Sequence, residues 1–231
     1  YDLKSAKRSL NLLFADWANR GLNRWTIEQV SLPLVTGIAD YPAGILTMTV
    51  GTVNSFTEGE NITGATSGAT ASITSATSAT VFAITIPSGT FVAGETIAGA
   101  TSGASTTVTS AVDFSNVRST IDILSAVIRQ NNGTADQSDI SISRISRDTF
   151  INIPSKRTTA RPSQFYIDRQ ITPIVKLWGT PDALTYTLVF DRLVRIDDVD
   201  NPQNTIDVPF RFYPCLAAGL AYYISLKKAP N

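Results

Sequence analysis

Both ends of the chain have the spacing of amphipathic helices. Residues 2–20 repeat apolar side chains three and four positions apart, which is the period of one face of an α-helix. Asp2 is a candidate N-cap of this helix, and Gly21 stands where helices often end on glycine. Near the other end, Pro209 or Pro214 opens a second predicted helix, because proline is tolerated in a first helical turn.

The second helix has a thin side of small residues that would let another helix approach closely; these are Ala217, Ala218, Gly219 and Ala221. We therefore expect the two terminal helices to pack against each other. The apolar side chains that would meet are Leu10, Leu13, Phe14 and Trp17 of the first helix and Leu216, Leu220 and Tyr223 of the second.

The chain between the helices shows the shorter alternation of β-strands. Strands are predicted at residues 25–34, 119–129, 138–144, 163–168, 174–178 and 184–190. Asn132-Gly133 marks a hairpin turn, and Ser146 is a candidate cap of a short helical turn within residues 145–154. Residues 36–42 are expected to form a turn that ends at Pro42, and the acidic, Asn-rich residues 192–204 an exposed loop.

An internal repeat interrupts this strand-rich region, because residues 56–76 return almost letter for letter at 91–111. Both copies contain the string Gly-Ala-Thr-Ser-Gly, at 64–68 and 99–103, which predicts tight turns; no Lys follows, so these are not phosphate loops. Strands are predicted at residues 47–50, 71–74, 80–86 and 106–109. Two such copies suggest a small barrel or sandwich with pseudo-two-fold symmetry.

The sequence therefore predicts an α+β protein in two domains. The first is discontinuous, residues 1–46 plus 113–231, with the terminal helices packed together on an antiparallel β body. The second is an inserted all-β domain of residues 47–112, which contains the repeat.

Composition narrows the chemistry. The chain has 231 residues, 43% of them hydrophobic, and its 19 basic residues balance 19 acidic ones, so there is no overall field to attract nucleic acid or an anionic membrane. It has no histidine, which excludes a Ser-His-Asp site and a His-based zinc site. We expect no enzyme activity, no metal and no cofactor.

Other features of the sequence bear on processing and location. The single cysteine, Cys215, allows no internal disulfide and is expected to be a small buried side chain. No apolar run reaches the roughly 18–20 residues that span a bilayer, and no signal peptide is visible. The chain begins at Tyr1 rather than Met and ends abruptly at Asn231, so we expect it to be cut from something longer.

Four residues are candidates for an interface with another subunit or a partner: Trp25, Arg157, Arg161 and Arg169. The three arginines lie near Lys156, Phe165 and Tyr166, a mixture that also occurs in single-stranded nucleic-acid sites. Pairing between subunits, with the acidic run Asp197-Asp198-Val199-Asp200, is at least as good an explanation of the arginines. That run lacks the pattern of a calcium loop. With Asp207 it supplies the candidate carboxylate pairs for another alternative, a carbohydrate-cleaving tail enzyme.

The flanks of the repeat resemble the head-to-tail adaptor proteins of short-tailed bacteriophages, also called connector or tail tubular proteins. The resembling strings follow one another in order through most of residues 1–46 and 113–231. They are residues 10–28, 142–150, 152–156, 161–169, Leu177-Trp178 with Pro181, 207–214 and 218–223.

The resemblance implies a structural virion protein, assembled in the host cytoplasm, that forms a ring at the head-tail interface; the ring is dodecameric in this family. The ring would join the portal protein to the tail nozzle, lie near a tail fibre, and extend the channel through which the genome DNA passes without sequence-specific binding. The helical part would face the portal and the β part the tail, with no membrane involved. In an alternative interpretation, the repeated insert is a tail-surface module that recognises host glycans or decorates the virion.

Overall fold

A computed structural model describes residues 3–53, 55–196 and 208–228. These residues form four α-helices and fourteen strands, and the predicted α+β class is confirmed. The chain divides into two compact units, one of Tyr1–Glu28 with Leu193–Asn231 and the other of Gln29–Arg192. Each unit is described by itself below.

The first unit contains both terminal helices, α1 (Leu3–Asn19) and α4 (Tyr213–Lys228), with the 3-10 turns η1 (Arg24–Thr26) and η2 (Phe210–Phe212). Helix α1 ends as predicted at Gly21, whose φ of 67° suits glycine. The Leu22 N–H donates to the Trp17 carbonyl and the Gly21 N–H to the Ala18 carbonyl, which closes a Schellman motif. The proposed cap Asp2 lies outside the described residues.

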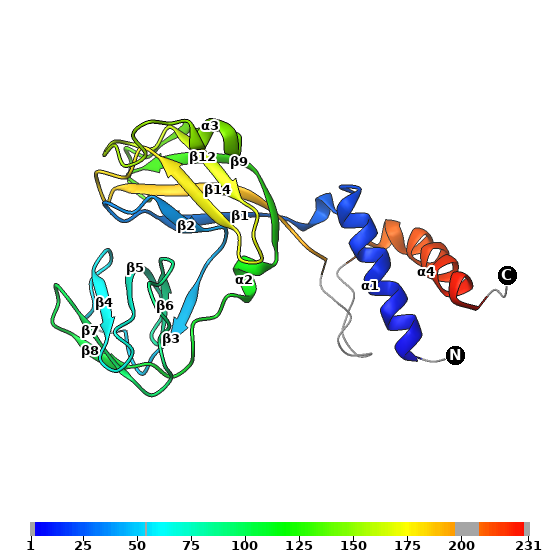
Figure 1. Ribbon diagram of the computed structural model, residues 1–231, viewed down its shortest axis with the longest axis horizontal. Helices are drawn as coiled ribbons and strands as arrows, with labels where there is room; N and C mark the ends of the chain where they lie inside the picture. Colours follow the sequence, from blue (N-terminus) through cyan, green and yellow to red (C-terminus); the bar gives the residue numbers. More distant parts are fainter. Residues whose placement is uncertain (1–2, 54, 197–207, 229–231) are drawn as a thin grey trace. The chain divides into compact units, whose positions relative to one another are not determined.

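The two helices pack together (Figure 1) around a cluster that contains all seven of the expected helix-packing side chains. Leu10, Leu13, Phe14 and Trp17 of α1 are buried, and Leu216, Leu220 and Tyr223 of α4 pack against them half-buried. Gly219 is the closest point, because a Cβ there would lie 2.8 Å from the Leu13 Cδ1 atom. Gly219 therefore lets α1 approach, whereas the other small residues of the predicted thin side, Ala217, Ala218 and Ala221, are exposed.

The second unit contains a β sandwich of two four-stranded sheets, ordered β1-β14-β9-β10 and β11-β12-β13-β2. Their bounds are β1 Ile27–Pro33, β2 Asp40–Pro42, β9 Thr120–Gln130, β10 Ser138–Ser141, β11 Ser143–Arg144, β12 Gln164–Asp168, β13 Ile174–Trp178 and β14 Tyr186–Val194. Pairing is antiparallel between β9 and β10, β12 and β13, and β13 and β2, whereas the short β11 runs parallel to β12. Short helices lie at α2 (Ser115–Arg118) and α3 (Arg147–Ile151), and the Ser146 hydroxyl caps α3 as predicted by accepting from the Thr149 N–H.

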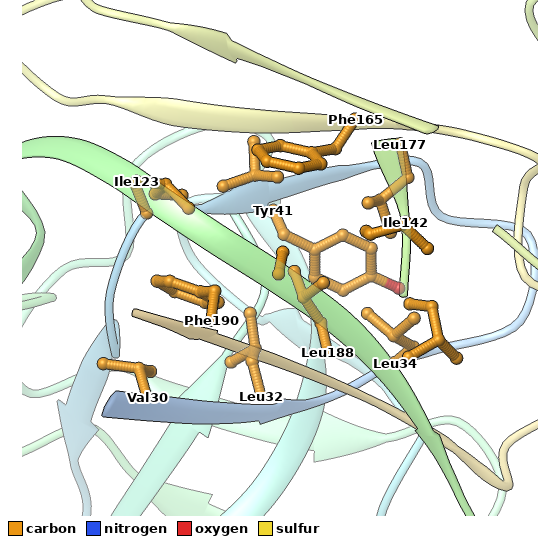
Figure 2. Close-up of a cluster of buried hydrophobic side chains, with 14 of the residues drawn as sticks. Val30, Leu32, Leu34, Tyr41, Ile123, Ile142, Phe165, Leu177, Leu188 and Phe190 are labelled. Carbon is orange, nitrogen blue, oxygen red and sulfur yellow. The ribbon is translucent and has the colours of Figure 1, made fainter. Parts of the chain in front are cut away.

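Apolar side chains from both sheets meet in one core (Figure 2), where the Tyr41 ring lies among Phe165, Leu177 and Leu188. Tyr41 is fully buried, and its hydroxyl accepts from the Val35 N–H and donates to the Val35 carbonyl. Burial raises the pKa of this phenol. The two hydrogen bonds tie Val35, at the start of the turn before β2, to Tyr41 within β2.

Three details of the sandwich correct the sequence analysis. Residues 40–42 form β2 rather than the end of a turn, because Tyr41 anchors them opposite Val175. The predicted strand 138–144 is two strands in different sheets, separated by the buried Ile142. The expected loop 192–204 is wrong at its start, because β14 continues to Val194 and Arg192 is buried, its guanidinium donating to the Asn116 carbonyl and the Thr120 hydroxyl. Residues 197–204 of that loop lie outside the described residues.

The repeat forms a six-stranded barrel of strand order β3-β6-β5-β4-β7-β8. The strands are β3 Thr47–Thr49, β4 Asn61–Gly64, β5 Thr70–Ser78, β6 Val81–Ile84, β7 Thr96–Gly99 and β8 Ser105–Thr107. The two edges join where Val50 bridges Val108 and the Gly51 N–H donates to the Thr107 carbonyl. The barrel has its own apolar core, which includes Met48, Phe82 and Phe91.

The expected pseudo-two-fold symmetry is visible in the strand register. Strands β4 and β7 occupy equivalent places in the two copies and pair with each other, Ile62 opposite Gly99 and Gly64 opposite Ile97. The sequence analysis missed both strands, because each has four residues and one large apolar side chain. That residues 47–112 are a domain inserted into 1–46 plus 113–231 stays a prediction, since the two compact units divide the chain at Glu28 and Arg192.

Candidate functional site

The described ranges offer no metal site, because nowhere in them do three Cys, Asp or Glu side chains gather as ligands would. The carboxylates considered for metal binding or carbohydrate cleavage, Asp197, Asp198, Asp200 and Asp207, lie outside those ranges. Cys215 is exposed on α4, so the expectation of a buried side chain is wrong. Helix α4 is apolar on every side, and composition alone does not tell which side faces α1.

The terminal helices leave several large apolar side chains in solvent, and we call these the hairpin surface. Its members are Leu3 and Leu12 of α1, Phe210 of η2, and Tyr213, Tyr222 and Leu226 of α4. Phe210 is 84% exposed and Leu3 64%. Leu3 and Leu12 are nine positions apart on α1, so they lie on different sides of that helix, whereas Tyr222 and Leu226 are one turn apart on α4. Large exposed apolar side chains of this kind are candidates for contact with another protein. Within the described residues, no helix is both long and apolar enough to cross a membrane.

Trp25 lies at the margin of the same unit. It is half-buried, its ring centroid is 4.5 Å from that of Phe212, and it meets Trp17 edge-on at 6.3 Å. The Trp25 indole therefore packs on the cluster between the helices, and only part of its surface is exposed for contact with a partner.

The three candidate arginines are exposed but do not gather in one place. Arg169 lines a hollow of about 360 Å³ together with Arg144 and Arg147, whereas Arg157 lines a separate groove. Arg169 and Arg144 grip the Asp122 carboxylate from two sides, at 2.7 Å and 2.9 Å. Both contacts are bidentate, so these guanidinium groups are already largely engaged.

The aromatic neighbours of these arginines are also engaged. Phe165 is buried in the sandwich core, and the Tyr166 ring stacks on Phe150 with centroids 5.5 Å apart. Phe165 therefore offers no face to a nucleic-acid base, and Tyr166, which lines the hollow beside Arg169, has one ring face covered by Phe150.

The groove beside Arg157 has a volume of about 640 Å³ and lies between the start of β2, the end of α3 and strand β13. Its walls combine apolar and cationic side chains. The main ones are Ile38, Phe150, Lys156, Arg157 and Lys176, with Asp40 at one side and Thr180 lining it from the turn after β13.

The barrel contains a pair of carboxylate sites that the sequence analysis missed. Glu60 of the first copy lies in the 99–103 loop of the second, where its carboxylate accepts from the Ser102 N–H at 3.0 Å and the Thr101 N–H at 3.2 Å. The Ser102 hydroxyl and the Thr57 N–H also donate to it. Glu60 is only 5% exposed.

Glu95 repeats this arrangement in the opposite direction. Its carboxylate accepts from the Ser67 N–H at 2.9 Å, the Thr66 N–H at 3.2 Å, the Ser67 hydroxyl and the Val92 N–H. Each copy of the repeat thus supplies the carboxylate that fills the turn of the other. We call this pair of contacts the reciprocal clasp.

The glycines of the clasp leave room for the carboxylates. A Cβ on Gly99 would lie 2.5 Å from a Glu60 oxygen, and one on Gly64 would lie 2.6 Å from a Glu95 oxygen. Gly68 and Gly103 close the same turns with φ of 67°. The signal in the sequence was the Gly-Glu pair that precedes the Gly-Ala-Thr-Ser-Gly string at the same distance in both copies.

The clasp stabilises the ionised carboxylates. For Glu60, burial is the largest influence and raises the pKa, but the hydrogen bonds from Ser102 and two further backbone N–H groups together lower it. For Glu95, the hydrogen bond from the Ser67 N–H is the largest influence, and the pKa is again lowered. All of these hydrogen-bond donors to the two carboxylates belong to the barrel itself, so the clasp is a contact that stabilises the barrel fold.

Comparisons with known proteins add no relative: no family model, no curated protein and no solved structure matches this chain.

Proposed function

We propose that this chain is a structural protein of a short-tailed bacteriophage virion, without enzyme activity. Copies of it form a ring that joins the portal protein to the tail nozzle and continues the DNA channel. The proposal rests on the resemblance of the strings outside the repeat, and the observation that best supports it is the hairpin surface.

The hairpin surface suits docking to a large partner. Its side chains are aromatic and aliphatic, which are the types that supply most binding free energy at interfaces. In the resemblance, the helical part of each subunit faces the portal. Docking there would remove Phe210 and Leu226 from water, which is favourable by about 25 cal/mol for each Å² of apolar area buried.

A ring also fits the chemistry of the rest of the chain. The groove beside Arg157 and the hairpin surface share no residue, so the groove is left for a contact between copies while the hairpin surface docks to the portal. Repeated head-to-tail contacts that close give a cyclic ring.

Portal docking tests the proposal through paired variants. Phe210→Glu and Leu226→Glu each place a charge on the hairpin surface, and Ile171→Glu makes the same kind of change at another apolar side chain, which is 87% exposed. Circular dichroism checks that all three remain folded, and sedimentation with the cognate portal protein measures binding.

We expect the two hairpin variants to bind portal at least about tenfold more weakly than the wild type, since burying an unpaired charge is costly. Ile171→Glu should bind normally. Wild-type binding by both hairpin variants would contradict the proposal that this surface docks.

A further inference from the structure

The groove beside Arg157 holds more positive than negative charge. Lys156, Arg157 and Lys176 face one carboxylate, that of Asp40. The Lys176 ammonium is 3.7 Å from the Asp40 carboxylate, which is a long contact for an ion pair. The excess of positive charge therefore favours a ligand that carries negative charge.

The cations differ in how far they are engaged. The Lys156 ammonium donates to the Ile151 and Ile153 carbonyls at 2.9 and 3.1 Å, and so holds the loop in place. Arg157 is exposed, and no hydrogen bond or ion pair joins its side chain to the described part of the chain. Its guanidinium has all five donors available for a carboxylate.

Like the Arg157 guanidinium, the Thr180 hydroxyl is a polar group of the groove without a hydrogen-bond partner in the described residues. Thr180 is only 5% exposed, and its backbone is fully paired, because its N–H donates to the Thr158 carbonyl and its carbonyl accepts from the Ala160 N–H at 2.8 Å each. Its hydroxyl, in contrast, has no hydrogen-bond partner. Burying an unpaired hydroxyl costs free energy, which a small rearrangement around a bound acceptor would recover.

Apolar side chains complete the groove and limit what would fit. Ile38 and Phe150, both half-buried, line it beside the cations. A bare phosphate or a strand of nucleic acid would leave these walls uncovered. A short peptide that carries carboxylates around one aliphatic side chain would fill both parts.

We propose that the groove binds the acidic segment Asp197-Asp198-Val199-Asp200 of a neighbouring copy of this chain. The segment offers three carboxylates around one valine, which matches three cations beside an apolar wall. This inference rests on the proposed ring, where each copy presents one groove to one neighbour and one acidic segment to the other. The contact would fix the order of subunits around the ring.

Charge-reversal variants of the full chain test the contact between the groove and the acidic segment of a neighbouring copy. Arg157→Glu sets a carboxylate against the acidic segment, and a triple variant with Lys at 197, 198 and 200 sets cations against the groove. Mass photometry over a concentration series measures how much protein is needed for half of it to assemble. Arg147→Glu is the control, because Arg147 is an exposed arginine that lines the other hollow.

Each charge-reversed chain should need at least about tenfold more protein to assemble, because like charges oppose each other at the interface. An equimolar mixture of the two should assemble within about threefold of the wild type, since every junction then pairs opposite charges. Thr180→Val, which removes the hydroxyl but keeps the shape, should weaken assembly by a smaller factor. A mixture no better than its components, or normal assembly by Arg157→Glu, would overturn the inference.

A second arm does not depend on ring formation. A fluorescent peptide of residues 195–204 should bind the full wild-type chain, bind more weakly as salt is added, and lose binding in Arg157→Glu. The same peptide with Asn at 197, 198 and 200 should bind at least about tenfold more weakly. If the chain forms no ring, the peptide experiment still shows whether the groove binds the acidic segment. Equal binding of both peptides, or tighter binding of a single-stranded oligonucleotide, would refute that inference.

Discussion

Replacing Glu60 by Gln tests the reciprocal clasp in depth. The change keeps the size of the side chain but leaves one oxygen in place of two, and turns an NH2 group toward backbone N–H donors. Thr101 and Ser102 both donate their N–H groups to the same Glu60 oxygen, so one amide orientation leaves both without an acceptor. The other orientation removes the acceptor of the Thr57 N–H at 2.6 Å.

The magnitude follows from these contacts. One or two backbone N–H groups would lose an ionised acceptor at a site that is only 5% exposed. Hydrogen bonds to charged groups contribute about 1.5–3 kcal/mol each, and unpaired buried donors cost a similar amount, so we expect the barrel to lose about 2–4 kcal/mol of stability.

Amide hydrogen exchange followed by mass spectrometry is the suitable assay, because the barrel residues 46–112 contain neither Trp nor Tyr and are silent in fluorescence. A loss of about 2–4 kcal/mol corresponds to exchange that is roughly 30-fold to 1,000-fold faster in β4 and β7. Glu58→Gln is the matched control, since Glu58 is exposed two residues away and should change stability by less than about 0.5 kcal/mol. Equal exchange rates in the two variants would refute the clasp as a stabilising contact.

Three further predictions concern the barrel and the sandwich. The clasp lowers the pKa of Glu60 and Glu95 below the ordinary value of 4.5, so its contribution to the barrel's stability should be complete above pH 4.5 and should be lost as the pH falls through the lower folded pKa values. Calorimetry of the wild type across this pH range should show this loss of stability, and Glu60→Gln should show a smaller loss. Phe82→Ala, at a side chain only 1% exposed, should cost the barrel about 3–5 kcal/mol, measured by hydrogen exchange, and a cost under about 1 kcal/mol would contradict the described core. Gly179→Ala should destabilise the sandwich by about 2–3 kcal/mol, because φ is 69° and the new Cβ would lie 2.6 Å from a backbone carbonyl oxygen. Hydrogen exchange of β12 and β13 measures this loss, and unchanged exchange there would contradict the prediction.

The elements with a long apolar period could be predicted from the sequence. Helix α1 and its end at Gly21 followed from spacing and from the need for a positive φ, and the α3 cap followed from Ser146. The barrel symmetry followed from the repeat, because two similar copies that fold together tend to pair equivalent strands.

The remaining features depend on contacts between distant residues. Strand β2 pairs with β13 and sends the Tyr41 ring into the core between the two sheets, which no local pattern reveals. Arg192 looked like the start of a loop, yet partners more than 70 positions away hold it in the interior. The clasp was hidden for the same reason, since Glu60 and Ser102 are 42 residues apart.

The central claim is that copies of this chain assemble as a ring that docks to a portal. Mass photometry of the purified chain, alone and with its cognate portal protein, together with negative-stain images, tests this claim most directly. The account predicts a closed ring, either free or formed on the portal. A monomer at every concentration that also ignores the portal would contradict it.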